Sequence, residues 1–197
     1  MATRIVIAED EALIRLDLKE TLEEEGYEVV GAVGRGDEAV ELVKELDPDL
    51  AILDIKMPGM DGITAAREIT SSRRAAVLIL TAFSQRDLVD QAIDAGVFSY
   101  LVKPFQTSDL IPAIEVALGR FADMRAKEAE VEGVKERLET QRIVGRAKGM
   151  LMDRDGMSEA DAFSFIQRTA MQHRAKMRTV AQQIIDGTLP SDGSAGS

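Results

Sequence analysis

Apolar and polar positions follow two different periods over the first part of the chain. Short runs rich in valine, isoleucine and leucine are typical of buried strands of a parallel sheet. We expect five strands, at Arg4–Ala8, Glu28–Ala32, Asp49–Asp54, Ala76–Thr81 and Phe98–Val102. Stretches with helical spacing follow them, at Ala12–Glu25, Asp37–Leu46, Ile63–Thr70, Arg86–Ala95 and Ser108–Leu118. This alternation predicts an α/β fold with a doubly wound, five-stranded parallel sheet.

Residues typical of helix ends support this division. Gly26 and Gly96 stand where helix C-terminal caps belong, because glycine readily adopts the left-handed backbone found there. Ser84 and Ser108 are placed to cap the helices that follow them, because a serine hydroxyl accepts a hydrogen bond from the first helical turn.

No strand is expected in the last third of the chain. Met124, Val131 and Leu138 recur every seven residues, which favours a helix that pairs with a second copy; the alternative is one long solvated helix. Gly156 ends a further helical stretch, and Ser158 opens the next. The expected divisions are a domain at 1–120, a connecting coiled-coil-like helix at 121–141, a three-helix module at 142–189 and a disordered polar tail at 190–197.

Composition narrows the class of protein. The 197 residues contain no cysteine and one histidine, so disulfides, thiolate nucleophiles and multi-histidine metal sites are excluded within one chain. The chain has no long apolar run, and acids follow soon after its first residue, which argues against a membrane span and a secretory signal. We expect a soluble cytoplasmic protein with no membrane partner.

Charge is distributed unevenly along the chain. The net charge is −11, and residues 1–118 alone hold 11 Lys/Arg against 23 Asp/Glu. Within residues 140–180 the balance is reversed, with 8 basic residues against 4 acidic ones. An acidic first part and a locally basic last part predict two modules with different partners.

Polar side chains gather where the predicted strands end. Glu9 and Asp10 follow the first strand, Asp54 ends the third, Thr81 ends the fourth, and Lys103 follows the fifth. In a doubly wound sheet, ligands bind outside the carboxyl ends of the strands. Any one of these residues could simply cap the sheet, but all five at one rim predict a binding site.

The chemistry of that rim favours phosphoryl transfer. Clustered carboxylates without histidine or cysteine suit Mg²⁺, which would neutralise their charge and hold a phosphoryl oxygen. Asp54 can then act as the nucleophile and become an aspartyl phosphate. Thr81 would donate a hydrogen bond to one phosphoryl oxygen, and Lys103 would neutralise another.

At these residues the first 118 or so positions resemble the receiver domain of two-component response regulators. The motifs "IAEDE", "ILDIKMPGMDG", "ILTA" and "SYLVKPF" stand in the family's order and spacing. The resemblance implies the flavodoxin-like strand order 2-1-3-4-5. It also implies that Asp54 accepts phosphate from a sensor histidine kinase, that Glu9, Asp10 and the backbone carbonyl of Lys56 hold the metal, and that Lys103 pairs with the phosphate.

The resemblance carries three further expectations. The bond from Lys103 to Pro104 is cis in most of the family. Thr81 and Tyr100 would be the hydroxyl and aromatic pair that change rotamer on phosphorylation, with a changed oligomeric state or domain arrangement as the result. The protein would not be an enzyme, apart from assisting its own phosphorylation and dephosphorylation.

The last part of the chain resembles the ANTAR module, a three-helix RNA-binding unit of transcription antitermination regulators. The stretches that match are "RAKGMLM" and "SEADAFSFIQRTAMQHRAKMRTVAQQII". This resemblance implies structured hairpin RNA as the partner. The residues expected to contact RNA phosphates are Lys148, Arg168, Arg174, Lys176 and Arg178.

Two alternatives to RNA binding remain at this point. A helix-turn-helix module would make the protein a DNA-binding response regulator, and a signalling hub would act through protein contacts alone. Phe163 is expected in a small helical core with Ala162, Ile166 and Ala170, and it shares its helix with Phe165. At least one of the two should be core, so no aromatic is obviously free to stack on bases. Recognition would then depend on RNA shape and loop edges.

Overall fold

The computed structural model describes residues 2–82 and 86–189. The chain divides into two compact units, unit 1 at Met1–Ala126 and unit 2 at Lys127–Ser197. The cap expected at Ser84 and the disorder expected at 190–197 lie outside the described residues. In the described part of the chain, no helix combines the length and the apolar character needed to cross a membrane.

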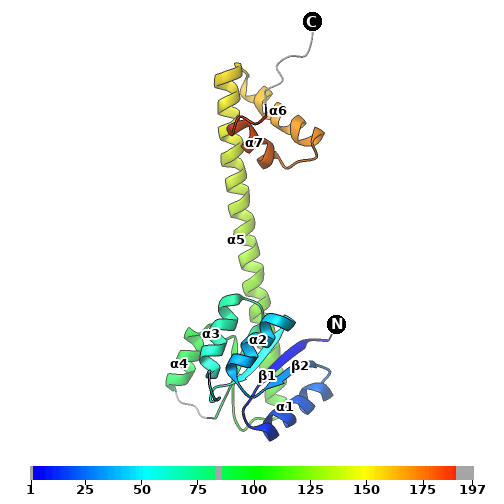
Figure 1. The fold of residues 1–197 in the computed structure, drawn as a ribbon, viewed down its shortest axis with the longest axis vertical. Helices are drawn as coiled ribbons and strands as arrows, with labels where there is room; N and C mark the ends of the chain where they lie inside the picture. The colour runs from blue at the N-terminus through cyan, green and yellow to red at the C-terminus, as the bar shows by residue number, and fades with distance from the viewer. Residues whose placement is uncertain (1, 83–85, 190–197) are drawn as a thin grey trace. The chain divides into compact units, whose positions relative to one another are not determined.

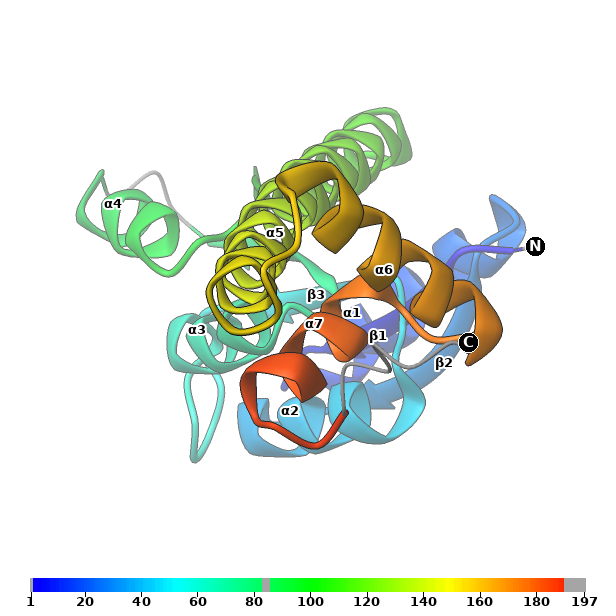
Figure 2. The same ribbon diagram turned by 90° about the horizontal axis from the view of Figure 1, so that it is seen from above.

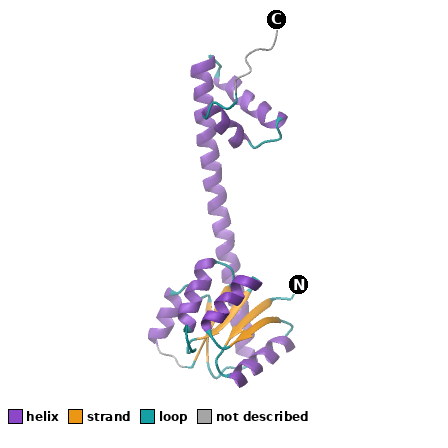
Figure 3. Ribbon diagram, in the orientation of Figure 1, coloured by secondary structure: helices purple, strands orange, loops and turns teal. Residues whose placement is uncertain are grey.

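Unit 1 is built on one five-stranded, all-parallel sheet with the order β2-β1-β3-β4-β5. Figure 3 shows the strands of this sheet in orange among the helices. The strands are β1 (Arg4–Ala8), β2 (Glu28–Val33), β3 (Leu50–Asp54), β4 (Ala76–Thr81) and β5 (Ser99–Val102). The predicted fold class and strand order are confirmed. β1, β3 and β4 are almost wholly buried, which explains why these strands are continuous apolar runs rather than alternating ones.

Helices cover both faces of this sheet (Figure 1). They are α1 (Ala12–Glu24), α2 (Gly36–Leu46), α3 (Gly62–Ser72), α4 (Arg86–Asp94) and the first turns of α5, which begins at Thr107. Side chains of α2 and α3 and the end of α4 pack with Val6 and Leu53 on one face. Side chains of α1 and α5 pack with Ile7 and Ile52 on the other. Successive strand residues therefore serve opposite cores.

The glycine caps are confirmed and one serine cap is not. Gly26 and Gly96 have φ of 88° and 77°, just past the ends of α1 and α4, where a residue with a Cβ would be strained. Ser108 lies inside the first turn of α5, because that helix begins one residue earlier. There the backbone N–H of Gln106 donates to Oδ2 of Asp109 at 3.0 Å.

Helix α5 runs without interruption from Thr107 to Asp155, over 49 residues. The helix end expected at Leu118 is wrong. Gly119 is the one residue there that disfavours a helix, and a glycine in a helix interior costs only about 1 kcal/mol relative to alanine. No proline or capping residue accompanies it, so the flanking helix formers carry the helix through.

Unit 2 packs the last turns of α5 against α6 (Glu159–Gln172) and α7 (Met177–Ile185), as Figures 1 and 2 show. Gly156, with φ of 66°, follows the end of α5, and Ser158 caps α6 by accepting from the backbone N–H of Asp161 at 3.2 Å. The small core of this unit consists of Val144, Ala147, Leu151, Ala162, Ile166, Ala170, Val180, Ala181 and Ile184.

A cap on α3 yields a stability prediction. Asp61 accepts from the backbone N–H of Thr64 at 2.8 Å and from its hydroxyl at 2.9 Å. Asp61→Ala should lower the free energy of unfolding of unit 1 by about 1 kcal/mol, because the first turn loses its acceptor. Both tyrosines, Tyr27 and Tyr100, lie in unit 1, so tyrosine fluorescence in urea reports its unfolding.

Two variants test whether the cap is the cause. Asp61→Asn keeps a side-chain acceptor and should lose much less stability. Ser158→Ala removes the equivalent cap of α6 in unit 2 and should leave the tyrosine transition unchanged. Equal losses for the alanine and asparagine variants at position 61 would show that the cap is not what stabilises this helix.

Candidate functional site

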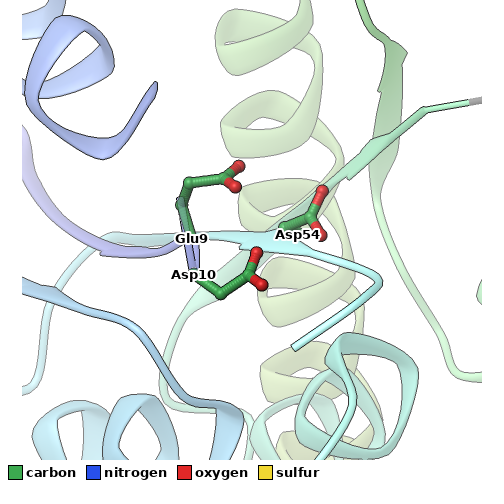
Figure 4. A group of neighbouring side chains, drawn as sticks. All are labelled: Glu9, Asp10 and Asp54. Carbon is green, nitrogen blue, oxygen red and sulfur yellow. The ribbon is translucent and has the colours of Figure 1, made fainter. Parts of the chain in front are cut away.

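The carboxyl ends of the central strands bring together the acids expected there. β1 and β3 are neighbours, and the strand order reverses between them, which is where ligands bind in such sheets. Glu9 and Asp10 follow β1, and Asp54 is the last residue of β3. Their carboxylate oxygens lie within 4.8 Å of one another, and Figure 4 shows the three side chains turned toward the same space.

The three carboxylates differ in their exposure to solvent. Glu9 is fully buried, Asp54 is 6% exposed, and Asp10 is exposed. A buried carboxylate loses much of its hydration, so its negative charge requires a nearby positive group. Three oxygen donors, one of them open to solvent, form a donor set that fits a hard divalent cation.

Lys103, which follows β5, supplies positive charge to both buried acids. Its Nζ donates to Oδ1 of Asp54 at 2.7 Å and also to Oε2 of Glu9. Burial alone would lower the pKa of Lys103, but the bonds to Asp54 and Glu9 outweigh it and the pKa is raised. The following bond to Pro104 is cis, as the resemblance implied.

The pKa of Glu9 is raised above its usual range. Burial is the largest cause, and the nearby charge of Asp54 adds to it. The hydrogen bond and charge of Lys103 oppose this shift without cancelling it. One lysine therefore does not fully compensate two buried acids, and the site keeps an excess of negative charge.

The loop that follows β3 binds the side chain of Asp54. Its Oδ2 accepts from the backbone N–H of Lys56 at 2.8 Å, so each carboxylate oxygen of Asp54 has one donor. The loop closes on itself where Gly62 N–H donates to the carbonyl of Ile55 at 2.9 Å. A Cβ on Gly62 would collide with the backbone carbonyl of Asp54, so only glycine fits this approach.

The remaining expected residues of this site lie on the neighbouring strands. Thr81 ends β4 and is buried, with a relative exposure of 3%. Tyr100 lies in β5 beside Ile79 of β4, and its side chain is 48% exposed. The hydroxyl is thus at the rim, while the aromatic ring has a large part of its surface in solvent.

One residue at this rim was missed by the sequence reasoning. Arg15 of α1 donates from its guanidinium to the backbone carbonyl of Glu9 and, at 3.4 Å, to that of Asp10. It therefore fixes the backbone that carries two of the acids. Its position in the middle of a helical stretch carries no signal, because the contact depends on how α1 packs beside β1.

The basic residues of unit 2 are brought together only in part. Arg174, Lys176 and Arg178 are exposed in and just after the turn between α6 and α7, and Arg168 is exposed on α6 shortly before it. Lys148 of α5 instead donates to Glu159 at 2.6 Å. That glutamate begins α6, roughly 20 Å from the turn at 1.5 Å per residue.

Comparison with known proteins agrees with this geometry. Residues 5–115 match the response regulator receiver domain family, and residues 132–185 match the ANTAR domain family. The chain belongs to the response regulators, as a receiver domain followed by an ANTAR domain. It is 58% identical over 183 residues to the transcriptional regulatory protein PdtaR of Mycobacterium tuberculosis, covering 93% of this chain and 89% of that protein.

Receiver domains alone match the first unit. The chemotaxis protein CheY of Bacillus subtilis is 43% identical over 119 residues, which is 60% of this chain and 99% of that one. The receiver domain structure of the response regulator NarL from Mycobacterium tuberculosis has a TM-score of 0.57 at 31% identity, covering 60% of this chain and 97% of that chain. These matches support the same fold for unit 1.

The raised pKa of Glu9 predicts a change of stability with pH. A carboxyl group whose folded pKa is raised favours folding at low pH, and that contribution is lost as pH rises from the unfolded value of 4.5 through the folded one. Glu9→Gln imitates the protonated acid, so it should raise the urea midpoint of unit 1 at pH 8 in buffer with a chelator. The gain should shrink toward pH 5.5.

Glu20→Gln is the matched control, because Glu20 is exposed on α1 and should show no such trend. Tyrosine fluorescence again follows the transition. A midpoint for Glu9→Gln that lies below that of the unaltered protein at pH 8 would mean that the bond to Lys103 outweighs the cost of burial.

Proposed function

We propose that Asp54 accepts a phosphoryl group from the phosphohistidine of a sensor histidine kinase, and that this controls RNA binding and transcription antitermination by the ANTAR domain. The observation that carries the proposal is the meeting of three carboxylates and one lysine at the switch point of the sheet. The protein works in the cytoplasm, where transcripts are made.

Phosphoryl transfer would use groups that are already in place. An oxygen of the Asp54 carboxylate forms the new bond to phosphorus, the phosphorus–nitrogen bond of the phosphohistidine breaks, and the imidazole leaves with its electron pair. Lys103, now bonded to Oδ1 of Asp54, stays beside the transferred group and offsets part of its charge. Thr81 at the end of β4 donates to a phosphoryl oxygen.

The metal of this site is proposed to be Mg²⁺. Glu9, Asp10, Asp54 and the backbone carbonyl of Lys56 would hold it, and oxygen donors without nitrogen or sulfur suit this ion. When bound, it supplies positive charge against the phosphoryl oxygens. Three carboxylates face one lysine here, and this excess of negative charge is the physical reason for cation binding.

The signal is proposed to leave the site through Thr81 and Tyr100. A phosphoryl group on Asp54 draws the Thr81 hydroxyl toward it, and the ring of Tyr100 moves inward into the space released. The 48% exposure of Tyr100 fits the state before phosphorylation. The receiver is not an enzyme in this scheme, beyond assisting gain and loss of its own phosphoryl group.

A second copy is the proposed partner of helix α5. Val131, Val134 and Leu138 are each about half exposed on this helix, which is unusual for apolar residues at such spacing in an unpaired helix. Pairing linked to phosphorylation would cover them. RNA is favoured over DNA or protein as the output partner because residues 132–185 match the ANTAR family.

The phosphorylation proposal predicts the behaviour of two variants. With a small phosphoryl donor and Mg²⁺, the full chain should gain one phosphoryl group, and Asp54→Asn should gain none. Asp10→Asn should slow labelling roughly tenfold or more, since residues that support metal sites commonly matter that much. Phos-tag electrophoresis and intact-mass measurement follow the product.

Asp61→Asn alters an acid of the same loop outside the carboxylate cluster and should be labelled normally. Labelling of Asp54→Asn to the unaltered level would overturn the assignment of the phosphoacceptor. Light scattering on the same samples tests pairing: an equal mass with and without phosphate would remove the second copy from the scheme.

The RNA proposal predicts a change in salt dependence. Arg174→Ala with Lys176→Ala should weaken hairpin binding and flatten the plot of log affinity against log salt by about one unit per lost phosphate contact at most. Lys127→Ala with Lys135→Ala removes the same charge from α5 and is the control. Phosphorylation of Asp54 should be unaffected by either pair, and equal slopes for the two pairs would contradict a role for the turn.

A further inference from the structure

Helix α6 presents a row of exposed, uncharged side chains. Phe163, Gln167 and Met171 are spaced four residues apart, so they lie one above another along one side of the helix. Phe163 is 42% exposed and Met171 is 73% exposed, and Gln167 is exposed between them. The residues of α6 that face the core are different ones, namely Ala162, Ile166, Thr169 and Ala170.

Phe163 is not needed to complete the core of unit 2. Phe163 and Phe165 are the two aromatic residues of this unit, and Phe165 packs against the buried cluster. The two side chains stand about 200° apart around the helix, at 100° per residue. The packing that buries part of Phe165 therefore leaves Phe163 42% exposed, so the expectation that Phe163 belongs to the core is wrong.

The two ends of this row differ in charge. At the start of α6, Glu159 accepts from Nζ of Lys148 and Asp161 is also exposed, so this end has no excess of positive charge. At the other end, the backbone N–H of Arg174 donates to the carbonyl of Met171 at 3.3 Å, and Arg168 is three residues from Met171 on the same helix. An aromatic ring, an amide and a thioether thus lead toward a basic end of the helix.

We propose that Phe163 stacks on an unpaired base of the RNA, with Gln167 and Met171 contacting the edge and face of the same base or of its neighbour. This rests on the RNA-binding function proposed above and names the part of the RNA that the domain reads. Bases have π-faces that stack on aromatic rings, and phosphates beside the flipped base on its Met171 side would meet Arg168 and Arg174.

A protein occupant fits this row less well. A partner helix would need a continuous apolar surface, whereas here an amide interrupts the row and basic residues lie at its Met171 end. The exposed apolar residues suited to pairing with a second copy are Val131, Val134 and Leu138 on α5. The interrupted row and the basic residues beyond Met171 therefore favour RNA as the occupant.

The test uses the full-length protein and a hairpin RNA enriched on it from a pool with a fixed stem and a randomised loop. Phe163→Ala should weaken binding of that hairpin about tenfold, as expected for loss of one base–aromatic stack. The slope against salt should stay unchanged, because no charge is lost. Phe163→Tyr keeps the ring and should bind within about twofold of the unaltered protein. Met152→Ala removes another exposed apolar side chain of unit 2 and should have no effect.

A second measurement ties the ring to a particular base. Each loop nucleotide is replaced in turn by an abasic one, and affinity is measured for the unaltered protein and for Phe163→Ala. At the stacked position, loss of the base should weaken binding to the unaltered protein about tenfold but should not weaken the variant further. If, at every loop position, the loss from the abasic nucleotide adds to the loss from Phe163→Ala, the proposal is overturned. This result would hold even if the variant is partly misfolded.

The outcomes separate this inference from the function on which it rests. If no loop is enriched from the pool, RNA binding itself fails. If a loop is enriched and its binding depends on Arg174 and Lys176, but Phe163→Ala binds it as tightly as the unaltered protein, only the stacking role is overturned. If Phe163→Ala changes the mass of the protein in light scattering but leaves its RNA affinity unchanged, Phe163 belongs to a protein interface.

Discussion

The receiver unit depends on how charge is compensated at the carboxyl end of its sheet. Glu9 and Asp54 are buried there, and each would be costly as an isolated anion. Lys103 bonds to both, so one positive charge is shared between two negative ones, and Asp10 adds a third at the solvent edge. The uncompensated charge makes the site receptive to a cation, and the tight loop at Gly62 keeps Asp54 in place for chemistry.

Helix α5 serves two cores with one continuous segment. Leu110 and Ile114 near its start are fully buried against the sheet of unit 1. Ala147 and Leu151 near its end are fully buried in unit 2. Each end of this helix is therefore fixed by the core of its own unit.

Much of the receiver could be predicted from the sequence because its signals are local. Short apolar runs rich in β-branched residues, such as Ala76–Thr81, favour strands buried on both faces, and the order of strands and helices restricts the sheet to a few topologies. Since parallel strands end at a common rim, residues next to strand ends, such as Asp10 and Lys103, could be placed near one another before any coordinates were known. The continuation of the helix beyond Leu118 could not be predicted from the sequence, because a single glycine does not decide whether a helix ends.

The sequence by itself determined the five strands, the acids at their ends and the two modules, because each depends on residue type and spacing along the chain. Only the tertiary structure decided which neighbours these residues meet. Arg15 reaches the carbonyl of Glu9 because α1 lies beside β1, and Lys148 is tied to Glu159 because α5 and α6 pack together. The exposure of Phe163 in place of Phe165 follows from the rotation of α6 about its axis. That rotation turns Ala162, Ile166 and Ala170 inward, where their small and branched side chains fit against the other two helices.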